Sequence, residues 1–240
     1  MEYYTKEFEF DVHDVDFNGV ARTSALMRII QTTAQSQLTD NNLSYDRLKS
    51  GKRAFILSRI KMEFTDEIRA YDRLTGVTFP CHSRGYSFLR CYKLLRGNKT
   101  VGRAASVWAL IDTDTHALVK VNDFDLGLTT YDPLDYPLSR IVMPEGMTEV
   151  GKYEVTYANV DQNRHMNNTR YPDMYANFLN LEGKRIEEIT INYINEAPAA
   201  DILTVYHAEK DGMHYFRTVR SDGKVNTEAE VRTVDLKNCK

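Results

Sequence analysis

The sequence predicts an α+β protein built from two copies of one unit, each a helix packed against an antiparallel sheet. Three observations support this prediction. A short motif returns more than half a chain later, an apolar helical face follows each motif, and strand-like runs follow each helix. A chain of 240 residues could hold one large domain or two small ones, and the repeat favours two.

The repeat begins with a short acidic motif. Val15-Asp16-Phe17-Asn18 returns as Val160-Asp161-Gln162-Asn163, 160 − 15 = 145 residues later. After each motif, apolar side chains follow at spacing i, i+3, i+4, i+7 and i+8, which is one face of an amphipathic helix. This face consists of Leu26, Ile29, Ile30, Thr33 and Ala34 in the first copy and Tyr171, Met174, Tyr175, Phe178 and Leu179 in the second. We therefore expect one long helix in each copy.

Runs of alternating, β-branched and aromatic residues predict one strand before each helix and four antiparallel strands after it. The predicted ranges are 7–12, 55–64, 74–81, 87–95 and 101–111, then 152–157, 186–193, 202–208, 214–219 and 224–234. Gly97-Asn98 and Asp222-Gly223 have the composition of hairpin turns. One helix against one curled antiparallel sheet, twice over, is the predicted fold.

A change of offset locates an insertion. Glu67 aligns with Glu196 at 196 − 67 = 129, and Arg90 aligns with Arg217 at 217 − 90 = 127. The first copy therefore carries 145 − 129 = 16 additional residues, around 40–53. This segment is polar, which predicts a loop or lid.

We expect a first domain of residues 1–125, a linker of residues 126–148 and a second domain of residues 149–240. The linker has no clear periodicity and contains Pro133, Pro137 and Pro144. Each small sheet has an edge that its neighbour covers best, so we expect the two domains to form a built-in dimer.

The composition is that of an ordinary globular protein and excludes several classes. With 31 basic and 34 acidic side chains the net charge is −3, which argues against a nucleic-acid binder. No stretch approaches the roughly 18 apolar residues of a membrane span, and no export signal is evident, so we expect a cytoplasmic protein. Cys81, Cys91 and Cys239 lack metal-ligand spacing, so we expect neither a disulfide framework nor a metal or cofactor.

The two copies differ in the residues that could react, because His165 stands where the first copy has Val20. Asp161, Asn163 and His165 alternate, so in an extended chain they would face one side, just before a helix N-terminus able to stabilise an oxyanion. Histidine titrates near neutrality and can move a proton. Glu196 follows a predicted strand and could supply a carboxylate that activates water.

Each of these residues also has a structural interpretation. An Asp-x-Asn sequence before a helix commonly forms a turn or a cap, and a single His is often only a hydrogen-bonded polar residue. Glu196 has a counterpart, Glu67, in the copy without the His. The joint occurrence of these residues at one predicted helix start favours chemistry.

The run Asp161-x-Asn163-x-His165-x-Asn167-Asn168, followed by Tyr193-x-x-Glu196, resembles the acyl-acyl carrier protein thioesterase family, whose fold is two fused hotdog domains. The first half is similar to the family in Phe55 to Arg59, Gly85 to Arg90 and Trp108 to Asp112, so the resemblance covers essentially the whole chain. Many plant members have a cysteine directly after the glutamate, and this chain has Ala197 there. The resemblance therefore implies attack by water rather than by a cysteine.

The resemblance implies that the protein hydrolyses the thioester between a fatty acyl chain and acyl carrier protein (ACP), releasing free fatty acid in fatty acid biosynthesis. Asp161, Asn163, His165 and Glu196 fall on the catalytic positions of the family. Glu196 would activate the water, and Asn163 and His165 would hold the thioester and its oxyanion. Asp161 would orient these groups or attack the thioester itself.

The resemblance also implies an acyl-chain slot and a protein partner. The first copy would bind the chain beneath its helix, near Leu26, Ile29 and Ile30. Acyl carrier proteins are acidic, so a basic face should guide docking. Its candidate residues are Arg84, Arg90, Lys93, Arg96, Lys99 and Arg103. We also consider a homodimer.

Three other functions fit parts of the pattern. An acyl-CoA thioesterase would use the same site with another carrier, and a comparison of CoA and ACP esters separates the two. A hotdog hydratase or dehydratase also places His and a carboxylate near a helix, although Asn167-Asn168 fits the thioesterase resemblance better. A noncatalytic acyl-binding protein has no evident use for a His in only one copy.

Overall fold

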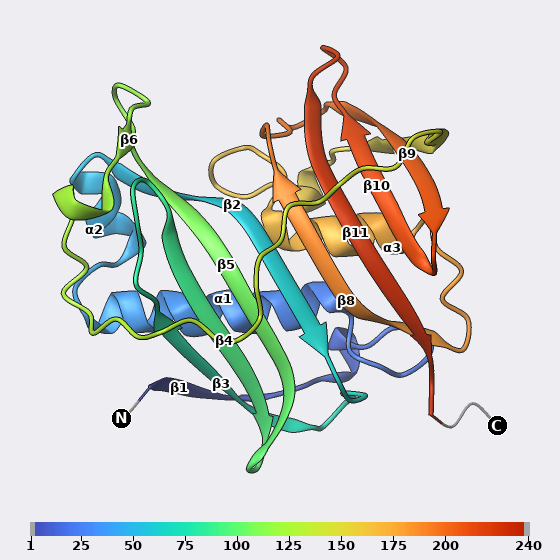
Figure 1. Ribbon diagram of the computed structural model, residues 1–240, viewed down its shortest axis with the longest axis horizontal. Helices are drawn as coiled ribbons and strands as arrows, with labels where there is room; N and C mark the ends of the chain where they lie inside the picture. Colours follow the sequence, from blue (N-terminus) through green and yellow to red (C-terminus); the bar gives the residue numbers. More distant parts are fainter. Residues whose placement is uncertain (1–2, 238–240) are drawn as a thin grey trace.

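The computed structural model describes residues 3–237, which form one antiparallel sheet of eleven strands with the helices on one face (Figure 1). The first copy contains β1 (Tyr4–Glu9), α1 (Thr23–Asp40), α2 (Tyr45–Ser50), β2 (Arg53–Phe64), β3 (Arg73–Pro80), β4 (Phe88–Arg96) and β5 (Lys99–Asp112). The short β6 (Leu118–Val119) follows. The second copy contains β7 (Thr148–Glu154), α3 (Tyr171–Ala176), β8 (Lys184–Tyr193), β9 (Ile202–Lys210), β10 (Met213–Val219) and β11 (Val225–Asp235).

The strands run in the order β1-β3-β4-β5-β2-β8-β11-β10-β9-β7, and β6 pairs with β5 alone. From the centre outward, the two halves have the same order of strands. The predicted fold class, two α+β units in a pseudo-dimer, is therefore confirmed. The two opening strands, β1 and β7, begin earlier in the chain than predicted.

The two copies are joined at the centre of the sheet, where β2 and β8 pair antiparallel. Ile60 lies opposite Ile191 and Met62 lies opposite Ile189, and all four side chains are fully buried. Each half thereby covers a sheet edge that the other would expose.

The second helix is much shorter than predicted. α3 has six residues and follows a 3-10 turn at Asn168–Arg170, whereas α1 has 18 residues. Phe178, expected on the apolar face of the helix, lies beyond its end and packs against Gly151 of β7. A Cβ at Gly151 would come within 2.9 Å of the Phe178 ring. This close approach, which a side chain at position 151 would block, holds Phe178 away from the helical path that the sequence predicts.

The insertion of the first copy is not a loop throughout, because it contains α2. The Ser44 hydroxyl caps this helix by accepting a hydrogen bond from the Arg47 backbone N–H at 3.3 Å. Leu48 is buried and α2 packs against β2. The insertion therefore forms a structured wall beside the sheet.

The segment between the two copies crosses the face of the sheet opposite the helices (Figure 1). Residues 124–147 contain no helix or strand. Tyr136 in this segment is buried in a small apolar cluster with Phe79, Cys81 and Cys91. The two cysteines are free thiols, and Cys239 lies outside the described residues. The domain boundaries drawn from the sequence stay predictions.

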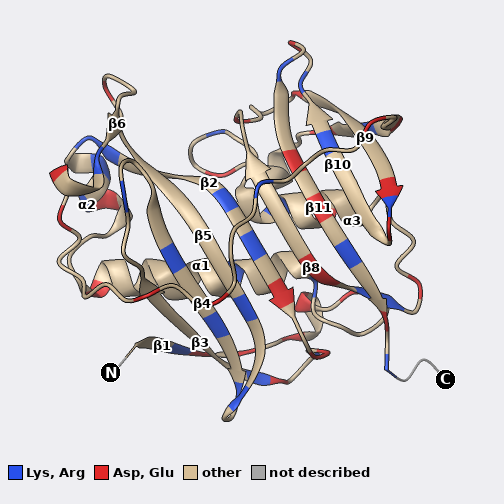
Figure 2. Cartoon of the chain, viewed as in Figure 1, with Lys and Arg blue, Asp and Glu red and all other residues tan. Residues whose placement is uncertain are grey.

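Four of the six basic residues expected to form a docking face are buried or already paired. Arg90 is buried, and the paired residues are Arg96 with Asp66 and Asp72, Lys99 with Asp66, and Arg103 with Glu63. Figure 2 shows basic and acidic bands interspersed along the strands. These residues do not form a free basic face, which corrects that expectation.

Arg90 and Arg217, which the repeat aligned, lie on opposite faces of the sheet. Arg90 faces α1 and donates to Gln37, whereas Arg217 pairs with Glu228 at 2.6 Å. Phe216 stacks on the α3 side, so its neighbour Arg217 must point outward. The alignment at an offset of 127 is therefore wrong, because a slip of one residue turns every strand side chain to the other face.

Candidate active site

A tight turn, not an extended chain, carries the predicted reactive residues. The Asp161 N–H donates to the His165 carbonyl at 3.1 Å, and the Arg164 N–H donates to the Asp161 carbonyl at 2.9 Å. Arg164 has φ 65°, the left-handed conformation that such a turn requires. The Asp161 carboxylate accepts the Asn163 N–H at 2.8 Å and so shapes the turn. The prediction that alternation would align these side chains in extended backbone is therefore wrong.

The turn nevertheless brings His165 to Glu196, as the sequence predicted. His165 Nδ1 and Glu196 Oε2 are 3.0 Å apart. The His165 side chain is 37% exposed and the Glu196 side chain 57%, so water reaches both. Backbone contacts fix the two segments, because the Met166 N–H donates to the Ala197 carbonyl at 2.8 Å. Arg220 Nη1 donates to the Glu196 carbonyl at 3.1 Å.

Asn163 receives a hydrogen bond from the first copy. The Tyr45 hydroxyl, at the start of α2, donates to Asn163 Oδ1 at 2.9 Å. With its oxygen engaged in this way, the Asn163 amide presents its NH2 group as a donor elsewhere. Sequence reasoning missed Tyr45, although it predicted that the insertion carrying this residue would form a loop or lid.

The first copy contains the same turn without the chemistry. Asp16 Oδ1 accepts the Asn18 N–H at 2.8 Å, and Gly19 has φ 71° at the position of Arg164. The Asn18 side chain donates to the carbonyls of Leu181 and Lys184 at 2.6 and 3.0 Å. The equivalent asparagine of the first copy therefore ties the two copies together.

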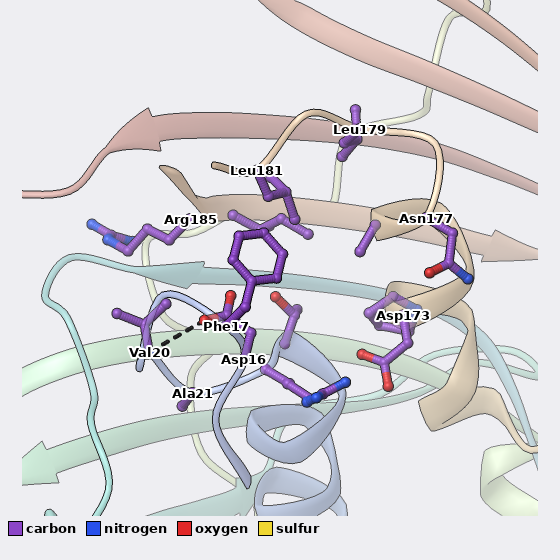
Figure 3. A pocket seen from close by; sticks show the side chains of 14 residues that line it. Asp16, Phe17, Val20, Ala21, Asp173, Asn177, Leu179, Leu181 and Arg185 are labelled. Atoms are coloured by element: carbon purple, nitrogen blue, oxygen red, sulfur yellow. Dashed lines mark hydrogen bonds between the residues drawn. The ribbon is translucent and has the colours of Figure 1, made fainter. Parts of the chain in front are cut away.

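A small cavity of about 210 Å³ lies beside this first turn. Figure 3 shows Asp16, Phe17 and Val20 of the first copy on one side of it and Leu179, Leu181 and Asp173 of the second copy on the other. Val20, the counterpart of His165, is 3% exposed.

Glu67 and Glu196, the two aligned glutamates, have different surroundings. The Glu67 carboxylate accepts the Lys237 N–H at 2.6 Å and a hydrogen bond from Arg69 at 2.6 Å, and these contacts hold the pKa of the carboxyl below its usual value. Its side chain is 11% exposed. Glu67 is therefore a structural residue, whereas Glu196 is open and faces His165.

A second, larger cavity of about 1060 Å³ includes the reactive turn and extends into the first copy. Asp161, Asn163, His165 and Glu196 line it in the second copy. In the first copy its lining includes Gln31, Ala34 and Leu38 of α1, Tyr45 and Leu48 of α2, and Phe55, Phe88, Arg90 and Trp108 of the sheet.

The cavity does not include the residues expected to hold the acyl chain. Leu26, Ile29 and Ile30 line neither of the two cavities. These three residues lie on the face of α1 that packs into the core. A different face of the same helix, with Gln31, Ala34 and Leu38, borders the larger cavity.

The fold has close relatives among solved structures. An acyl-ACP thioesterase from Bacteroides thetaiotaomicron matches with a TM-score of 0.87 and 21% identity, covering 96% of this chain and 97% of that one. A 12:0-ACP thioesterase from Umbellularia californica matches with a TM-score of 0.84 and 13% identity, covering 97% of each chain. No curated protein matches the chain in sequence. At these identities the structural likeness shows the double hotdog fold alone.

The His165–Glu196 pair lines the large cavity of this double hotdog fold, and the family models that match the chain give its class, a thioester hydrolase. The family model of the acyl-ACP thioesterase N-terminal domain matches residues 1–125, and that of the C-terminal domain matches residues 144–235. The chain therefore belongs to the acyl-ACP thioesterase family, which hydrolyses fatty acyl-ACP. No helix within residues 3–237 is long and apolar enough to cross a bilayer.

Proposed function

We propose that this chain carries out thioester hydrolysis with Glu196 as the general base for water. The observation that carries the proposal is the 3.0 Å contact between His165 Nδ1 and Glu196 Oε2 in the large cavity. Glu196 takes one proton from water as the water oxygen bonds to the thioester carbon. The resulting oxyanion collapses, the C–S bond breaks, and the proton returns through the His165–Glu196 pair to the thiolate.

Asn163 stabilises the developing oxyanion in this proposal. Its NH2 group is a neutral donor that can face the carbonyl oxygen, since Tyr45 occupies its Oδ1. Tyr45 is a positioning residue, because it acts through Asn163. Through Tyr45, the insertion of the first copy becomes part of the reactive centre of the second.

Asp161 is a positioning residue rather than a nucleophile. Its carboxylate accepts the Asn163 N–H, and Asp16 makes the same bond in the copy that has no His. A carboxylate used identically in both turns serves the shape of the turn. Of the two roles left open by the sequence, this geometry supports orientation.

The test uses purified full-length protein and one fatty acyl-ACP ester. Glu196→Gln keeps the shape of the side chain and removes the base, so the catalytic rate should fall while the melting temperature stays within about 2 °C of wild type. Full activity in this variant would overturn the assignment. The same acyl chain on CoA, measured in parallel, shows how far the enzyme discriminates between the two carriers.

The acyl chain lies in the first-copy part of the large cavity in this proposal. Ala34 is a small residue on its α1 wall, so Ala34→Phe should shorten the preferred chain. Ile30→Val, a change in the core face of the same helix, is the matched control and should leave the chain-length profile unaltered. An identical profile in wild type and Ala34→Phe contradicts this placement.

Docking of the acidic carrier protein is assigned to Arg164 and Arg170. Both are exposed beside the reactive turn, Arg170 lines the large cavity, and neither forms an ion pair with a described acidic side chain. Positive charge at the mouth steers an acidic partner toward the site.

The cellular setting completes the proposal. We place the protein in the cytoplasm, in fatty acid biosynthesis, and cell fractionation tests this. A homodimer would use the free sheet edges at β1 and β7, which end the strand order. Light scattering of the purified protein decides between monomer and dimer.

A further inference from the structure

The large cavity contains a buried positive charge. Arg90 lies on the inner face of β4, is 7% exposed and lines the cavity. Its Nη1 donates to Gln37 Oε1 at 2.5 Å and to Thr78 Oγ1 at 3.1 Å. Both acceptors are neutral, so the guanidinium is held in place without being neutralised.

The arginine has no carboxylate partner among residues 3–237, and neither its Nε nor its Nη2 has an acceptor there. Other arginines of the sheet do have one: Arg103 pairs with Glu63 and Arg217 with Glu228. A buried charge is costly unless it is paired. Burial indeed lowers the pKa of the Arg90 guanidinium from its usual value.

A second donor lines the same cavity without a partner. Gln31 Nε2 on α1 is buried and has no hydrogen-bond partner within the described chain. Gln31 and Arg90 come from the two walls, helix and sheet, between which an acyl chain would lie. A buried donor without a partner, such as Gln31 Nε2, beside a buried charge without a carboxylate, such as Arg90, indicates a place for an oxygen acceptor.

The register of the sheet gives the distance from the reactive turn. Arg90 pairs with Ser106, Ser106 with Ile60, and Ile60 with Ile191, which is on β8. Three strand spacings separate Arg90 from β8, or about 14 Å. Glu196 lies three residues beyond the last residue of β8, Tyr193, so Arg90 lies in the part of the cavity remote from the thioester.

We infer that the remote part of the cavity is a polar subsite that binds an acyl chain bearing an oxygen function, above all a carboxylate, near its far end. The carboxylate would accept from Nε and Nη2 of Arg90 in the paired geometry that guanidinium favours, and a hydroxyl or oxo group would accept one bond. The inference rests on the proposed placement of the acyl chain in this cavity.

The first experiment measures binding without turnover. The Glu196→Ala variant is titrated calorimetrically with free fatty acids of one length carrying an ω-methyl, ω-hydroxyl or ω-carboxyl group. We expect the ω-carboxyl acid to bind at least about tenfold more tightly than the ω-methyl acid, the effect of one hydrogen bond to a charged group. Tightest binding of the ω-methyl acid would overturn the subsite.

The second experiment compares variants. Arg90→Met should remove the preference for the ω-carboxyl acid and Arg90→Lys should retain part of it. Because Arg90 also links β4 to α1, Gln31→Leu provides a change that breaks no observed hydrogen bond, and it should reduce the preference for the ω-hydroxyl acid. A preference unchanged in both Arg90→Met and Gln31→Leu contradicts the inference.

The two proposals fail separately. If the ω-carboxyl acid binds no better than the ω-methyl acid but Glu196→Gln still abolishes hydrolysis, the subsite is wrong and the reactive centre stands. If no acyl acid competes with substrate in the wild-type enzyme, the placement of the acyl chain itself is wrong.

Discussion

The turns at Asp16–Val20 and Asp161–His165 have the same backbone and different uses. Each closes with an Asp carboxylate on the Asn N–H and a left-handed fourth residue, Gly19 or Arg164. In the first copy the Asn side chain is bonded to the other half and a buried Val follows. In the second copy Asn163 accepts one hydrogen bond from Tyr45 of the insertion, and the partly exposed His165 follows. The backbone therefore supplies position, and the side chains decide between holding and reacting.

The largest expected difference between the two copies concerns the glutamates. His165→Ala or Glu196→Ala should lower the catalytic rate by about 10²- to 10⁴-fold with little change in stability. Glu67→Ala, the matched change in the first copy, should lower the melting temperature and leave the rate near wild type. A rate loss of equal size in Glu67→Ala would erase the distinction between the copies.

The two corresponding asparagines should differ in the same way: Asn163 should affect the rate, and Asn18 should affect the stability. Asn163→Ala removes the proposed oxyanion donor, so kcat should fall about 10- to 1000-fold. Asn18→Ala removes hydrogen bonds across the two copies and should reduce the free energy of unfolding by about 1–3 kcal/mol, with kcat retained. Denaturant unfolding and steady-state kinetics on the same two proteins make the comparison.

The lid tyrosine should have a smaller effect. Tyr45→Phe removes only the hydroxyl that fixes Asn163, so kcat should fall about 2- to 10-fold while KM changes little. Tyr4→Phe loses a hydrogen bond to Asp40, in which no residue lining the large cavity takes part, and serves as the control. If kcat in the Tyr45→Phe variant equals that of the control, Tyr45 does not position Asn163.

The smallest effect is expected at the docking arginines. Arg164→Ala should raise KM for acyl-ACP a few-fold at low salt, and the difference should shrink at high salt, because screening weakens attraction between exposed charges. Gly19, the counterpart of Arg164 in the first copy, is not a suitable control position, because its φ of 71° would strain any other residue placed there. Arg84→Ala, a change in the loop between β3 and β4 at a residue that does not line the large cavity, is used instead, and an equal rise in KM in both variants would count against local steering.

The sequence is sufficient for the repeat and the strand pattern, because these follow from side-chain periodicity, but it does not show which strands join the two copies. It is not sufficient where a contact between distant segments decides the outcome. The position of Phe178 outside α3 involves a close approach to Gly151 of β7, and the orientation of Arg90 depends on a one-residue register. The turn at Asp161 could have been predicted, because Gly19 stands at its left-handed position in the first copy.

The candidate site also combines residues that the sequence predicts with contacts that only the folded chain shows. His165 and Glu196 were identified by residue type and meet in the fold at 3.0 Å. Tyr45 carries no motif, and only the folded chain brings it to Asn163 across 118 positions. The resemblance implies an acyl-chain slot near Leu26, Ile29 and Ile30, but a likeness of motifs does not show which face of α1 borders the cavity, and these three residues lie in the core.

The pairing of β2 with β8 has a consequence for stoichiometry. Two separate identical subunits joined by this seam would carry two equivalent centres, and each substitution would appear in both. In a single chain the seam is internal, so one half can lose its histidine while the other keeps it. Each 27.7 kDa polypeptide should therefore release one fatty acid per turnover and bind one equivalent of a tight inhibitor, without cooperativity inside the chain.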